Sequence, residues 1–303
     1  MDRVRQMEVF IQVMESGNFT RAADALGLPR STVSTVIQTL EDRLGTQLLR
    51  RSTRSMVATD EGERFLGTAR EIVDALADAD QMFRQESEQL KGRLRIDMPS
   101  RIGRRYVIPA LPDWLEQHPS LEVEVSTTDR IVDLISEGVD CLIRVGALLN
   151  SDVICRKLGD VQIMTCASPC YLERYGVPQK PNGLSGHRMV NYGSSLPVDG
   201  ASFDYVSRTG PVEVPMAHAV TVDNAEAYIA AACAGLGMIQ VPAFDIRDLL
   251  ESEKLVPVLQ NYPSPPMQLS LLYARRRNVP VRIAVFQDWV RALLIHERVF
   301  ERW

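Results

Sequence analysis

The sequence predicts an α/β protein with a small, mainly helical domain and a long helix on its N-terminal side. Three observations support this fold class. Residues 4–44 hold three short segments with apolar residues at helical spacing, and residues 65–90 hold one long segment with heptad spacing. Strand-like and helix-like patterns then alternate over residues 94–295, which is typical of an α/β body. The 303 residues, 45% of them hydrophobic, are sufficient for two or three cores.

The first 44 residues fit three helices joined by short turns. The helices are expected at residues 4–15, 21–26 and 30–44. Thr20 is a fair N-cap for the second helix, and Pro29 suits the start of the third because a proline lacks the N–H that would be unpaired there. Ala23, Gly27 and Val33 fall where a helix-turn-helix needs a small residue, a turn residue and an apolar anchor.

The third helix has an apolar stripe and an opposite face of short polar side chains. The polar face consists of Ser31, Thr32, Ser34, Thr35 and Gln38. Small hydroxyl and amide groups suit a helix that lies in a DNA groove among phosphates and base edges. An ordinary solvated face is the alternative, although such faces usually carry more Lys and Glu. Together with the helix-turn-helix spacing, this face predicts a DNA-reading helix.

A two-stranded wing is expected directly after the third helix. The segments Leu48-Leu49-Arg50-Arg51 and Met56-Val57-Ala58 have strand composition and flank a polar turn at 52–55. In such a wing, Arg50, Arg51 and Arg54 would lie beside the DNA backbone or the minor groove.

A long helix is expected after the wing. Thr-Asp-Glu-Gly at 59–62 is a good helix start, because acidic side chains are favourable near the positive end of the helix dipole. Apolar residues follow at heptad spacing: Phe65, Ala69, Ile72, Leu76, Ala79, Phe83 and Leu90. The narrow seam favours a dimer contact. Packing of the helix on its own domain is the alternative, and it would favour a wider stripe.

The remaining chain is expected to alternate between helices and strands. Helices are expected at 103–117, 131–137, 224–234 and 280–295, and strands at 121–126, 140–145, 238–241 and 269–273. Gly92 is expected to end the long helix. The loop-rich stretches 182–200 and 260–267 are places where a subdomain could be entered or left.

The formal net charge of -5 argues at first against a nucleic-acid partner. The charge is unevenly distributed, however. Residues 18–58 carry six arginines against three acids, whereas residues 60–90 carry three arginines against nine acids. A modestly basic N-terminal segment followed by an acidic helix remains compatible with DNA binding, and the acidic helix limits non-specific attraction of the protein to DNA.

The cysteines and histidines do not indicate catalysis, a metal site or a cofactor. The five scattered cysteines fit structural thiols in a reducing cytoplasm, with Cys233 as a redox sensor the less favoured alternative. The four histidines sit in no nucleophile or metal-ligand pattern, so we expect no enzyme. The charged N-terminus does not suit a secretory signal, which favours a cytoplasmic protein without a membrane partner. A small-solute-binding protein without a DNA role is the main alternative function.

The chain resembles LysR-type transcriptional regulators over its full length. The resemblance is carried by the segment from Phe19 to Gly62 and by GRLRIDMP at Gly92, LPDWLEQHPSLEVEV at Leu111, VDCLIRVG at Val139, ASPCYLERYGVP at Ala167 and AGLGMIQVP at Ala234. It implies a winged helix-turn-helix domain at 1–59, a dimerising linker helix at 60–90 and an effector-binding domain at 91–303. That last domain should comprise two Rossmann-like α/β subdomains resembling periplasmic binding proteins, one at 91–161 and 267–303 and the other at 162–266.

The resemblance also implies an effector site in the cleft between these subdomains. The matching positions are Ser100, Arg101, Thr127, Thr128, Arg144 to Gly146, Ser202, Phe203, Asp223 and Asn224. Ser100 and Asn224 are expected at helix N-termini, where free N–H groups and the dipole favour an anion. A small carboxylate is therefore the expected effector. In the alternative, Ser100 and Asn224 are plain N-caps and the nearby Arg101, Arg104 and Arg105 are solvated.

The resemblance further implies a dimer, paired into a tetramer, that binds double-stranded promoter DNA and bends it differently once an effector is bound. A contact with RNA polymerase belongs to the same expectation. The chain departs from the family at Pro29-Arg30-Ser31-Thr32, where Ser-Gln-Pro-Ala is usual, and at Thr35-Val36, where Arg-Gln is common. Thr35 cannot bind phosphate as a cation, so Arg30, Arg51 and Arg54 become the expected phosphate contacts.

Overall fold

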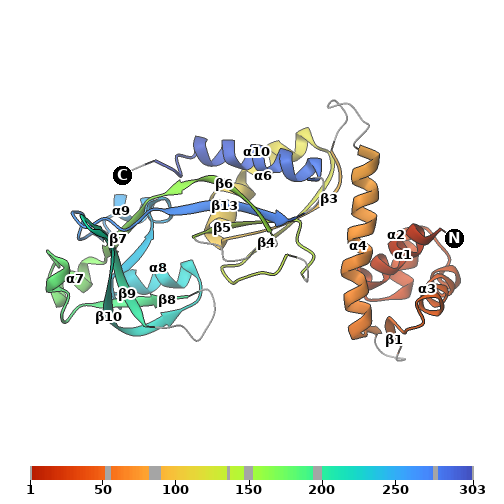
Figure 1. The fold of residues 1–303 in the computed structure, drawn as a ribbon, viewed down its shortest axis with the longest axis horizontal. Coiled ribbons are helices and arrows are strands. Elements are labelled where there is room, and N and C mark those ends of the chain that lie inside the picture. Colours follow the sequence, from red (N-terminus) through yellow and green to blue (C-terminus); the bar gives the residue numbers. More distant parts are fainter. Residues whose placement is uncertain are drawn as a thin grey trace. The chain divides into compact units, whose positions relative to one another are not determined.

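The structure is a computed structural model that describes residues 2–51, 56–81, 90–134, 137–146, 153–193, 200–275 and 279–301 (Figure 1). The chain divides into two compact units, which we call the head and the C-terminal module. The head holds Met1–Glu88 and Asp133–Gly138, and the module holds Gln89–Val132 and Val139–Trp303. Each unit is described by itself.

The head is a helical domain with a small wing. Its elements in chain order are α1 (Arg3–Ser16), α2 (Phe19–Leu26), α3 (Arg30–Leu44), β1 (Leu49–Arg51), β2 (Met56–Ala58) and α4 (Asp60–Gln81). The bounds predicted for α3 are confirmed. The predicted N-cap of α2 is wrong, because the Asn18 side chain holds that position and accepts a hydrogen bond from the Thr20 N–H.

The wing and the start of α4 form as the sequence predicts. Strands β1 and β2 pair antiparallel, with Leu49 opposite Ala58. The Thr59 hydroxyl oxygen accepts the Gly62 N–H at 3.0 Å, which caps the first turn of α4. The prediction that Gly92 ends this helix is wrong. Gly92 lies in a strand opposite Leu121, at a positive φ of 100° that suits glycine.

The C-terminal module has two lobes (Figure 1). The first lobe contains a five-stranded sheet in the order β4-β3-β5-β13-β6. Its strands are β3 (Lys91–Met98), β4 (Ser120–Thr127), β5 (Cys141–Val145), β6 (Val153–Val161) and β13 (Met267–Ala274). β3 runs parallel to β4 and β5, whereas β13 runs antiparallel to β5 and β6.

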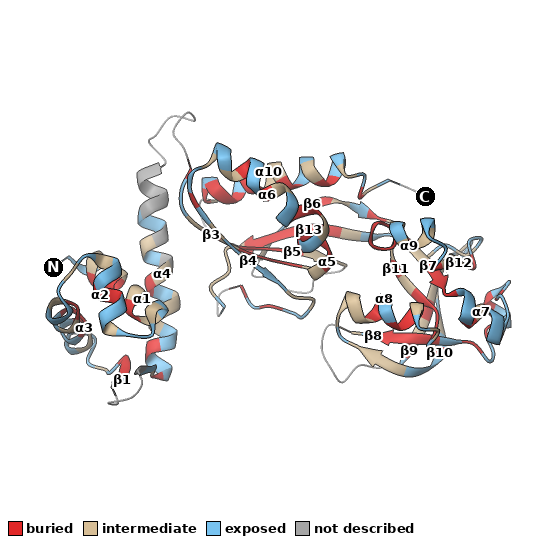
Figure 2. Cartoon of the chain, turned by 180° about the vertical axis from the view of Figure 1, so that it is seen from behind, coloured by how far each residue is buried: buried red, intermediate tan, exposed pale blue. Residues whose placement is uncertain are grey.

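Two helices close the core of the first lobe. They are α6 (Ile108–Gln117) and α10 (Val281–His296), and Trp114 of α6 stacks on Trp289 of α10 with ring centroids 4.9 Å apart. The buried side chains of these helices and of β3, β5 and β13 form one apolar cluster. Figure 2 shows the corresponding buried segments in red.

The helix that leads into α6 contains a widened turn. It begins with α5 (Ser100–Ile102) and continues as a π-helical turn, Gly103–Val107. The N–H of Ile108 bonds to the carbonyl of Gly103, five residues earlier. The helix expected at 131–137 is absent from its described residues, 131–134 and 137, where Ile131 is exposed and the chain turns.

The second lobe contains two three-stranded sheets and short helices. One sheet has the order β11-β7-β12 and the other the order β8-β10-β9. The strands are β7 (Ile163–Ala167), β8 (Arg188–Tyr192), β9 (Ala201–Ser207), β10 (Gly210–Val222), β11 (Ile239–Pro242) and β12 (Val256–Pro257). The α-helices are α7 (Pro169–Tyr175), α8 (Ala225–Cys233) and α9 (Arg247–Glu251), and short 3-10 turns occur at Pro181–Gly183 and Ala243–Asp245.

Seven of the eight helices and strands expected in this part of the chain lie close to their predicted positions. The exception is the helix expected at 131–137. The chain passes from the first lobe to the second between β6 and β7 and returns at β13. Within the described part of the chain, the helices are too short or too polar to cross a membrane.

Candidate functional site

The helix-turn-helix presents the polar face of α3 to solvent. Val33, Val36, Ile37 and Leu40 are buried against α1 and α2, so the opposite face points outward. Gly27 makes the turn at a φ of 62°, a left-handed conformation that glycine adopts without strain. Of the predicted DNA contacts on α3, Arg30, Ser31, Thr35 and Gln38 are exposed, and Thr32 and Ser34 are half-buried.

The N-terminal part of α3 borders a shallow groove of about 360 Å³. The groove is lined by Gln6, Ser31, Thr32, Thr35, Val36 and Thr39. The Thr35 hydroxyl donates to the Ser31 carbonyl at 2.9 Å, and the Thr39 hydroxyl donates to the Thr35 carbonyl at 2.8 Å. Both oxygens can still accept from a partner outside the helix. This end of α3 therefore offers small polar groups without any acidic side chain.

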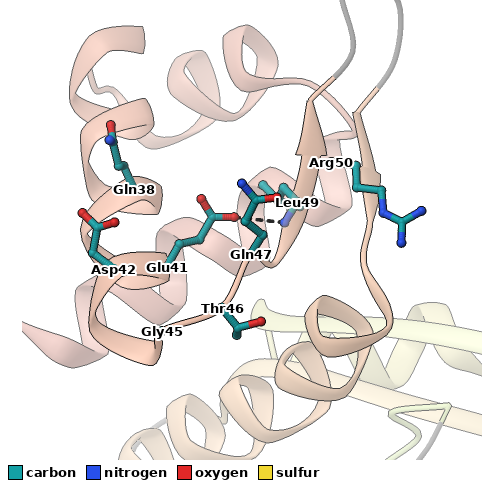
Figure 3. A pocket seen from close by; sticks show the side chains of 8 residues that line it. All are labelled: Gln38, Glu41, Asp42, Gly45, Thr46, Gln47, Leu49 and Arg50. Carbon is teal, nitrogen blue, oxygen red and sulfur yellow. Dashed lines mark hydrogen bonds between the residues drawn. The ribbon is translucent and has the colours of Figure 1, made fainter.

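The C-terminal part of α3 has a different character. A hollow of about 850 Å³ lies between this part of the helix and β1, and it is lined by Gln38, Glu41, Asp42, Gly45, Thr46, Gln47, Leu49 and Arg50 (Figure 3). One carboxylate oxygen of Glu41 accepts the N–H groups of Leu48 and Leu49 at 2.8 and 3.0 Å, which fixes the wing to α3. The acidic side chains here disfavour a phosphate group, and the first half of α3 lacks them.

The wing arginines are only partly described. Arg50 is exposed at the rim of the hollow between α3 and β1. Arg51 ends β1, and its side chain lies outside the described part of the structure. Arg54 also lies outside the described residues. The predicted phosphate contacts of Arg51 and Arg54 therefore stay predictions.

The predicted dimer seam of α4 divides into two parts. The Phe65 ring lies 5.4 Å from the Phe10 ring of α1, and Ala69 is fully buried. Both residues pack on the chain's own domain, as the alternative expects, and their contact with a second chain stays a prediction. Ile72 and Leu76 are 40% and 47% exposed and remain available to a second chain. The Ala79 side chain and Phe83 lie outside the described residues.

In the C-terminal module, the two predicted helix N-termini meet a carboxylate that the sequence interpretation missed. Asp129 accepts the Ser100 N–H at 3.1 Å and the Ser100 hydroxyl at 3.2 Å. The same side chain accepts the Ala225 N–H at 2.7 Å, at the start of α8 in the other lobe. Asn224 is a plain N-cap whose side chain accepts the Ala227 N–H. The groups expected to bind an anion are thus already bonded to Asp129.

The arginines that follow Ser100 pair with acids of the second lobe. Arg101 is only 4% exposed and contacts Glu226 at 2.7 Å and Asp245 at 3.3 Å. Arg104 pairs with Glu226, and Arg105 pairs with Asp248. The alternative of solvated arginines fits Arg104, whose side chain is 66% exposed, but it does not fit Arg101 or Arg105. Effector binding by Arg101 stays a prediction. These ion pairs connect the two lobes. The sequence alone does not indicate them, because the partners lie more than a hundred residues apart along the chain.

Burial of Asp245 has an electrostatic consequence. Desolvation raises the pKa of its carboxyl to about 7, against the lowering effect of Arg101 and Arg105. The carboxyl therefore changes charge near neutral pH while it lies between the two lobes.

Each of the other predicted cleft positions has its own contacts or exposure in the structure. Arg144 pairs with the buried Asp97, and the Thr128 hydroxyl lies 3.5 Å from the same carboxylate. Thr127 is exposed at the end of β4, and the Gly146 N–H donates to the Gln268 carbonyl. Asp223 is exposed beside Asn224.

A cavity of about 260 Å³ lies in the second lobe near these positions. Its lining includes Ser202, Asp204, Tyr192, Tyr228 and Gln240. Phe203, predicted to contact the effector, is instead fully buried in the core on the opposite side of β9, because successive strand residues face opposite ways. The same alternation indicates that Asp204 shares a face with Ser202, a signal the sequence interpretation missed.

Two of the thiols lie in surroundings that disfavour the thiolate. Burial raises the pKa of Cys233 and Cys166, which favours the unreactive thiol over the thiolate. Among the described residues, no group of His, Cys, Asp and Glu side chains is arranged to hold a metal ion.

Comparisons with known proteins agree with both halves of the structure. Residues 4–63 match the model for bacterial regulatory helix-turn-helix proteins of the lysR family, and residues 87–294 match the LysR substrate binding domain. The Escherichia coli K12 protein YhjC, an uncharacterized HTH-type transcriptional regulator, is 40% identical over 97% of this chain and 98% of its own length. The E. coli K12 transcriptional activator AaeR is 31% identical over 94% and 92%.

Solved structures give the same result. The regulator CrgA from Neisseria meningitidis aligns with a TM-score of 0.60 and 27% identity, covering 96% of this chain and 99% of CrgA. The Vibrio cholerae virulence activator AphB aligns with a TM-score of 0.57 and 27% identity, with the same coverage. Family models and relatives together span nearly the whole sequence, and this chain belongs to the LysR-type transcriptional regulators.

Proposed function

We propose that this protein binds double-stranded promoter DNA as an oligomer through α3 and the wing, and that a small-molecule effector bound to the C-terminal module alters this binding or the bend of the DNA. The observation that carries the proposal is the exposed polar face on the N-terminal half of α3, which carries no acidic side chain, in a helix-turn-helix. Exposed Arg30 supplies positive charge at the start of α3, and exposed Arg50 supplies it on β1. Base readout is assigned to Ser31, Thr32, Ser34, Thr35 and Gln38.

The polar contacts between the lobes support control by an effector. Asp129, Arg101 and Arg105 bond across from one lobe to the other, and such contacts can be exchanged for water or ligand groups. An effector that binds one arrangement of the lobes more tightly shifts the population toward it. A contact with RNA polymerase and a cytoplasmic location belong to the same proposal.

The dimer is proposed to form through the exposed part of α4, around Ile72 and Leu76. Pairing of dimers into a tetramer is proposed from family membership. The direction of regulation is left open, because the relatives include a named activator in E. coli and a named repressor in Pseudomonas aeruginosa that is 33% identical.

The expected carboxylate effector has lost its main physical support. The N–H groups of Ser100 and Ala225 donate to Asp129, and the guanidinium groups of Arg101 and Arg144 are bonded to carboxylates. A carboxylate effector would have to displace Asp129. Binding of carboxylates such as benzoate to the full-length protein tests this expectation.

The test of this function is binding of the purified full-length chain to labelled DNA from upstream of its own gene, followed by fluorescence anisotropy. We expect binding that withstands an excess of unrelated competitor DNA. A folded protein that binds no promoter DNA at low salt would contradict the proposal and favour a solute-binding protein without a DNA role.

A further inference from the structure

The cavity in the second lobe has one charged side chain among the described residues that line it. The full lining is Ile163, Val190, Asn191, Tyr192, Gly200, Ala201, Ser202, Asp204, Tyr228, Gln240, Ser264, Pro265 and Met267. Asp204 is the acid, and this lining includes no Lys, Arg or His. An anion that enters would meet a carboxylate without a compensating cation, whereas a cation would find its counter-charge.

The backbone of Asp204 is held by hydrogen bonds to another side chain, so its carboxylate is not needed to fix the residue and remains available to a ligand. The Gln240 side chain accepts the Asp204 N–H at 2.9 Å and donates to the Asp204 carbonyl at 2.7 Å, so β9 is fixed against β11 at this residue. One carboxylate oxygen accepts the Ser202 hydroxyl at 3.0 Å. An ionised carboxylate has about four acceptor positions, so capacity remains for a charged donor.

Two tyrosines form an aromatic wall of the same cavity. The rings of Tyr192 and Tyr228 have centroids 5.0 Å apart and planes inclined by 45°. The Tyr228 hydroxyl accepts the Gln240 N–H at 3.1 Å, which ties this ring to the residue that also positions Asp204. Burial raises the pKa of Tyr192 to about 12 and raises that of Tyr228 further, so both rings are neutral. Neutral aromatic faces attract cations.

The surroundings of the cavity extend the same charge preference. The carboxylates of Asp129, Asp223 and Asp245 all act on the Tyr192 hydroxyl, opposed by Arg144. Arg144 is itself bonded to Asp97. The cation nearest this wall is therefore already paired with an acid, and the acids around Tyr192 favour a positively charged ligand.

We infer that the effector is a small organic cation, such as a protonated amine with an apolar or aromatic body, whose charge lies against Asp204 and the faces of Tyr192 and Tyr228. The inference rests on the proposed function for the existence of an effector, and it assigns the chemical class of that effector. Ser202 and Gln240 position the carboxylate, and Ile163 and Met267 supply apolar contact for the body of the ligand.

The test compares ligands of matched shape and different charge on the full-length protein. Benzylammonium, benzyl alcohol and benzoate, with longer-chain members of each class, are assayed by thermal shift and then by calorimetry at neutral pH. We expect the cations to raise the melting temperature and the neutral and anionic members to leave it unchanged. A panel in which no cation binds, or in which a neutral compound or carboxylate binds more tightly, overturns the inference.

Variants separate the charge from the shape of the cavity. Asp204→Asn keeps the size of the side chain, and we expect it to weaken cation binding by about 10- to 100-fold, since a hydrogen bond to a charged group is lost. Tyr192→Phe should retain most of the affinity and Tyr192→Leu should lose it, because the ring face is the binding group. Asp113→Asn, at an exposed position of α6, is the matched control and should bind as the parent does. Circular dichroism confirms that each variant is folded.

The two proposals fail in different ways. Wild-type protein that binds cations but not promoter DNA contradicts the regulatory function and leaves the ligand class intact. Wild-type protein that binds promoter DNA and responds to a carboxylate contradicts the cation inference alone. Equal cation affinity in Asp204→Asn and wild type also overturns the assignment of Asp204.

Discussion

The carboxylate of Asp129 lies 2.7 Å from the backbone nitrogen of Ala225 and accepts its N–H across the boundary between the two lobes. The same side chain accepts the N–H and hydroxyl of Ser100. One acid therefore satisfies the first turns of two helices in different lobes. Negative charge at a helix N-terminus is favourable, and here it acts on two helix ends at once.

Replacing Asp129 with Asn should destabilise the folded C-terminal module. The amide loses the negative charge at both helix ends and has a single oxygen to accept three donors. We expect the free energy of unfolding to fall by about 1–3 kcal/mol, the cost of unsatisfied partly buried donors. Urea denaturation measures this change. Asp113→Asn, at an exposed site, should leave the stability unaltered, and an equal effect of both substitutions would remove Asp129 from this role.

Asp245 should make stability depend on pH in a defined direction. Its folded-state pKa of about 7 lies above the ordinary value near 4, so the folded chain binds more protons than the unfolded chain between these values. This group therefore contributes stability at low pH that is lost as the pH rises through 7. Asp245→Asn should become more stable relative to wild type as the pH rises, by at most about 1.4 kcal/mol per pH unit.

The comparison with wild type is needed because two histidines act in the opposite direction. Burial lowers the pKa of His118 and His187, so their contribution to stability grows as the pH rises toward 6.5. Both histidines are present in wild type and variant, and their effect cancels in the difference. A stability difference that is constant from pH 4 to 8 would contradict a titration of Asp245 in this range.

Two glycines of α4 should respond oppositely to alanine. A Cβ at Gly62 would collide with the carbonyl of Leu48, which cannot move without disturbing the wing. We expect Gly62→Ala to cost about 1–3 kcal/mol by overpacking. Gly67 lies in the same helix, and a Cβ there meets nothing within 4 Å. Gly67→Ala should stabilise the head by about 0.5–1 kcal/mol through helix propensity. Thermal denaturation of both variants measures these stability changes. Destabilisation by both substitutions would refute the explanation by local packing at each glycine.

Arg30 should contribute a phosphate contact that Arg43 does not. Both arginines are exposed on α3, but Arg43 lies beside the acidic end at Asp42. Arg30→Ala should weaken binding to all DNA sequences and lower the slope of log affinity against log salt by about one. Arg43→Ala should change the slope less. Anisotropy titrations over a range of salt measure both, and the same slope for Arg30→Ala and wild type would argue against the contact. The equivalent expectation stands for Arg54.

The exposed part of α4 should control association. Ile72→Glu or Leu76→Glu places a charge on the face proposed to meet a second chain, so we expect dissociation toward monomers at unchanged head stability. Phe65→Ala, which removes the contact with Phe10, should lower the melting temperature without affecting the mass in solution. Analytical ultracentrifugation distinguishes the two outcomes. Dimers that persist in both charge variants would place the contact elsewhere.

Local patterns predicted the elements well where several signals coincide. The bounds of α3 were predicted from its apolar stripe and from Pro29 before it, and in the structure Gly45 ends the helix in a left-handed conformation. At 131–137 the apolar residues lack caps, and spacing alone was insufficient to identify the turn. The heptad spacing of α4 placed Phe65 and Ile72 on one stripe, but spacing does not state whether a stripe meets its own domain or a second chain.

The candidate site was less predictable because its contacts join distant parts of the sequence. Arg101 and Asp245 lie 144 positions apart, and neither residue alone indicates the pair. Ser100 and Asn224 do lie at helix starts, as predicted. The sequence did not show that the carboxylate of Asp129 would accept hydrogen bonds from both of these helix starts. Charge complementarity within a folded cleft depends on which acids face it, and that is decided by tertiary packing.

The contacts between the lobes have a thermodynamic consequence. Separation of the lobes exposes the charged groups of Arg101 and Glu226, and it also removes Phe244 from the apolar cluster of the first lobe, where its ring lies 6.0 Å from the Tyr106 ring. The heat capacity of a protein rises mainly with exposed apolar area. Separation of the lobes should therefore raise the heat capacity, and the exposure of Phe244 and Tyr106 should contribute most of that rise.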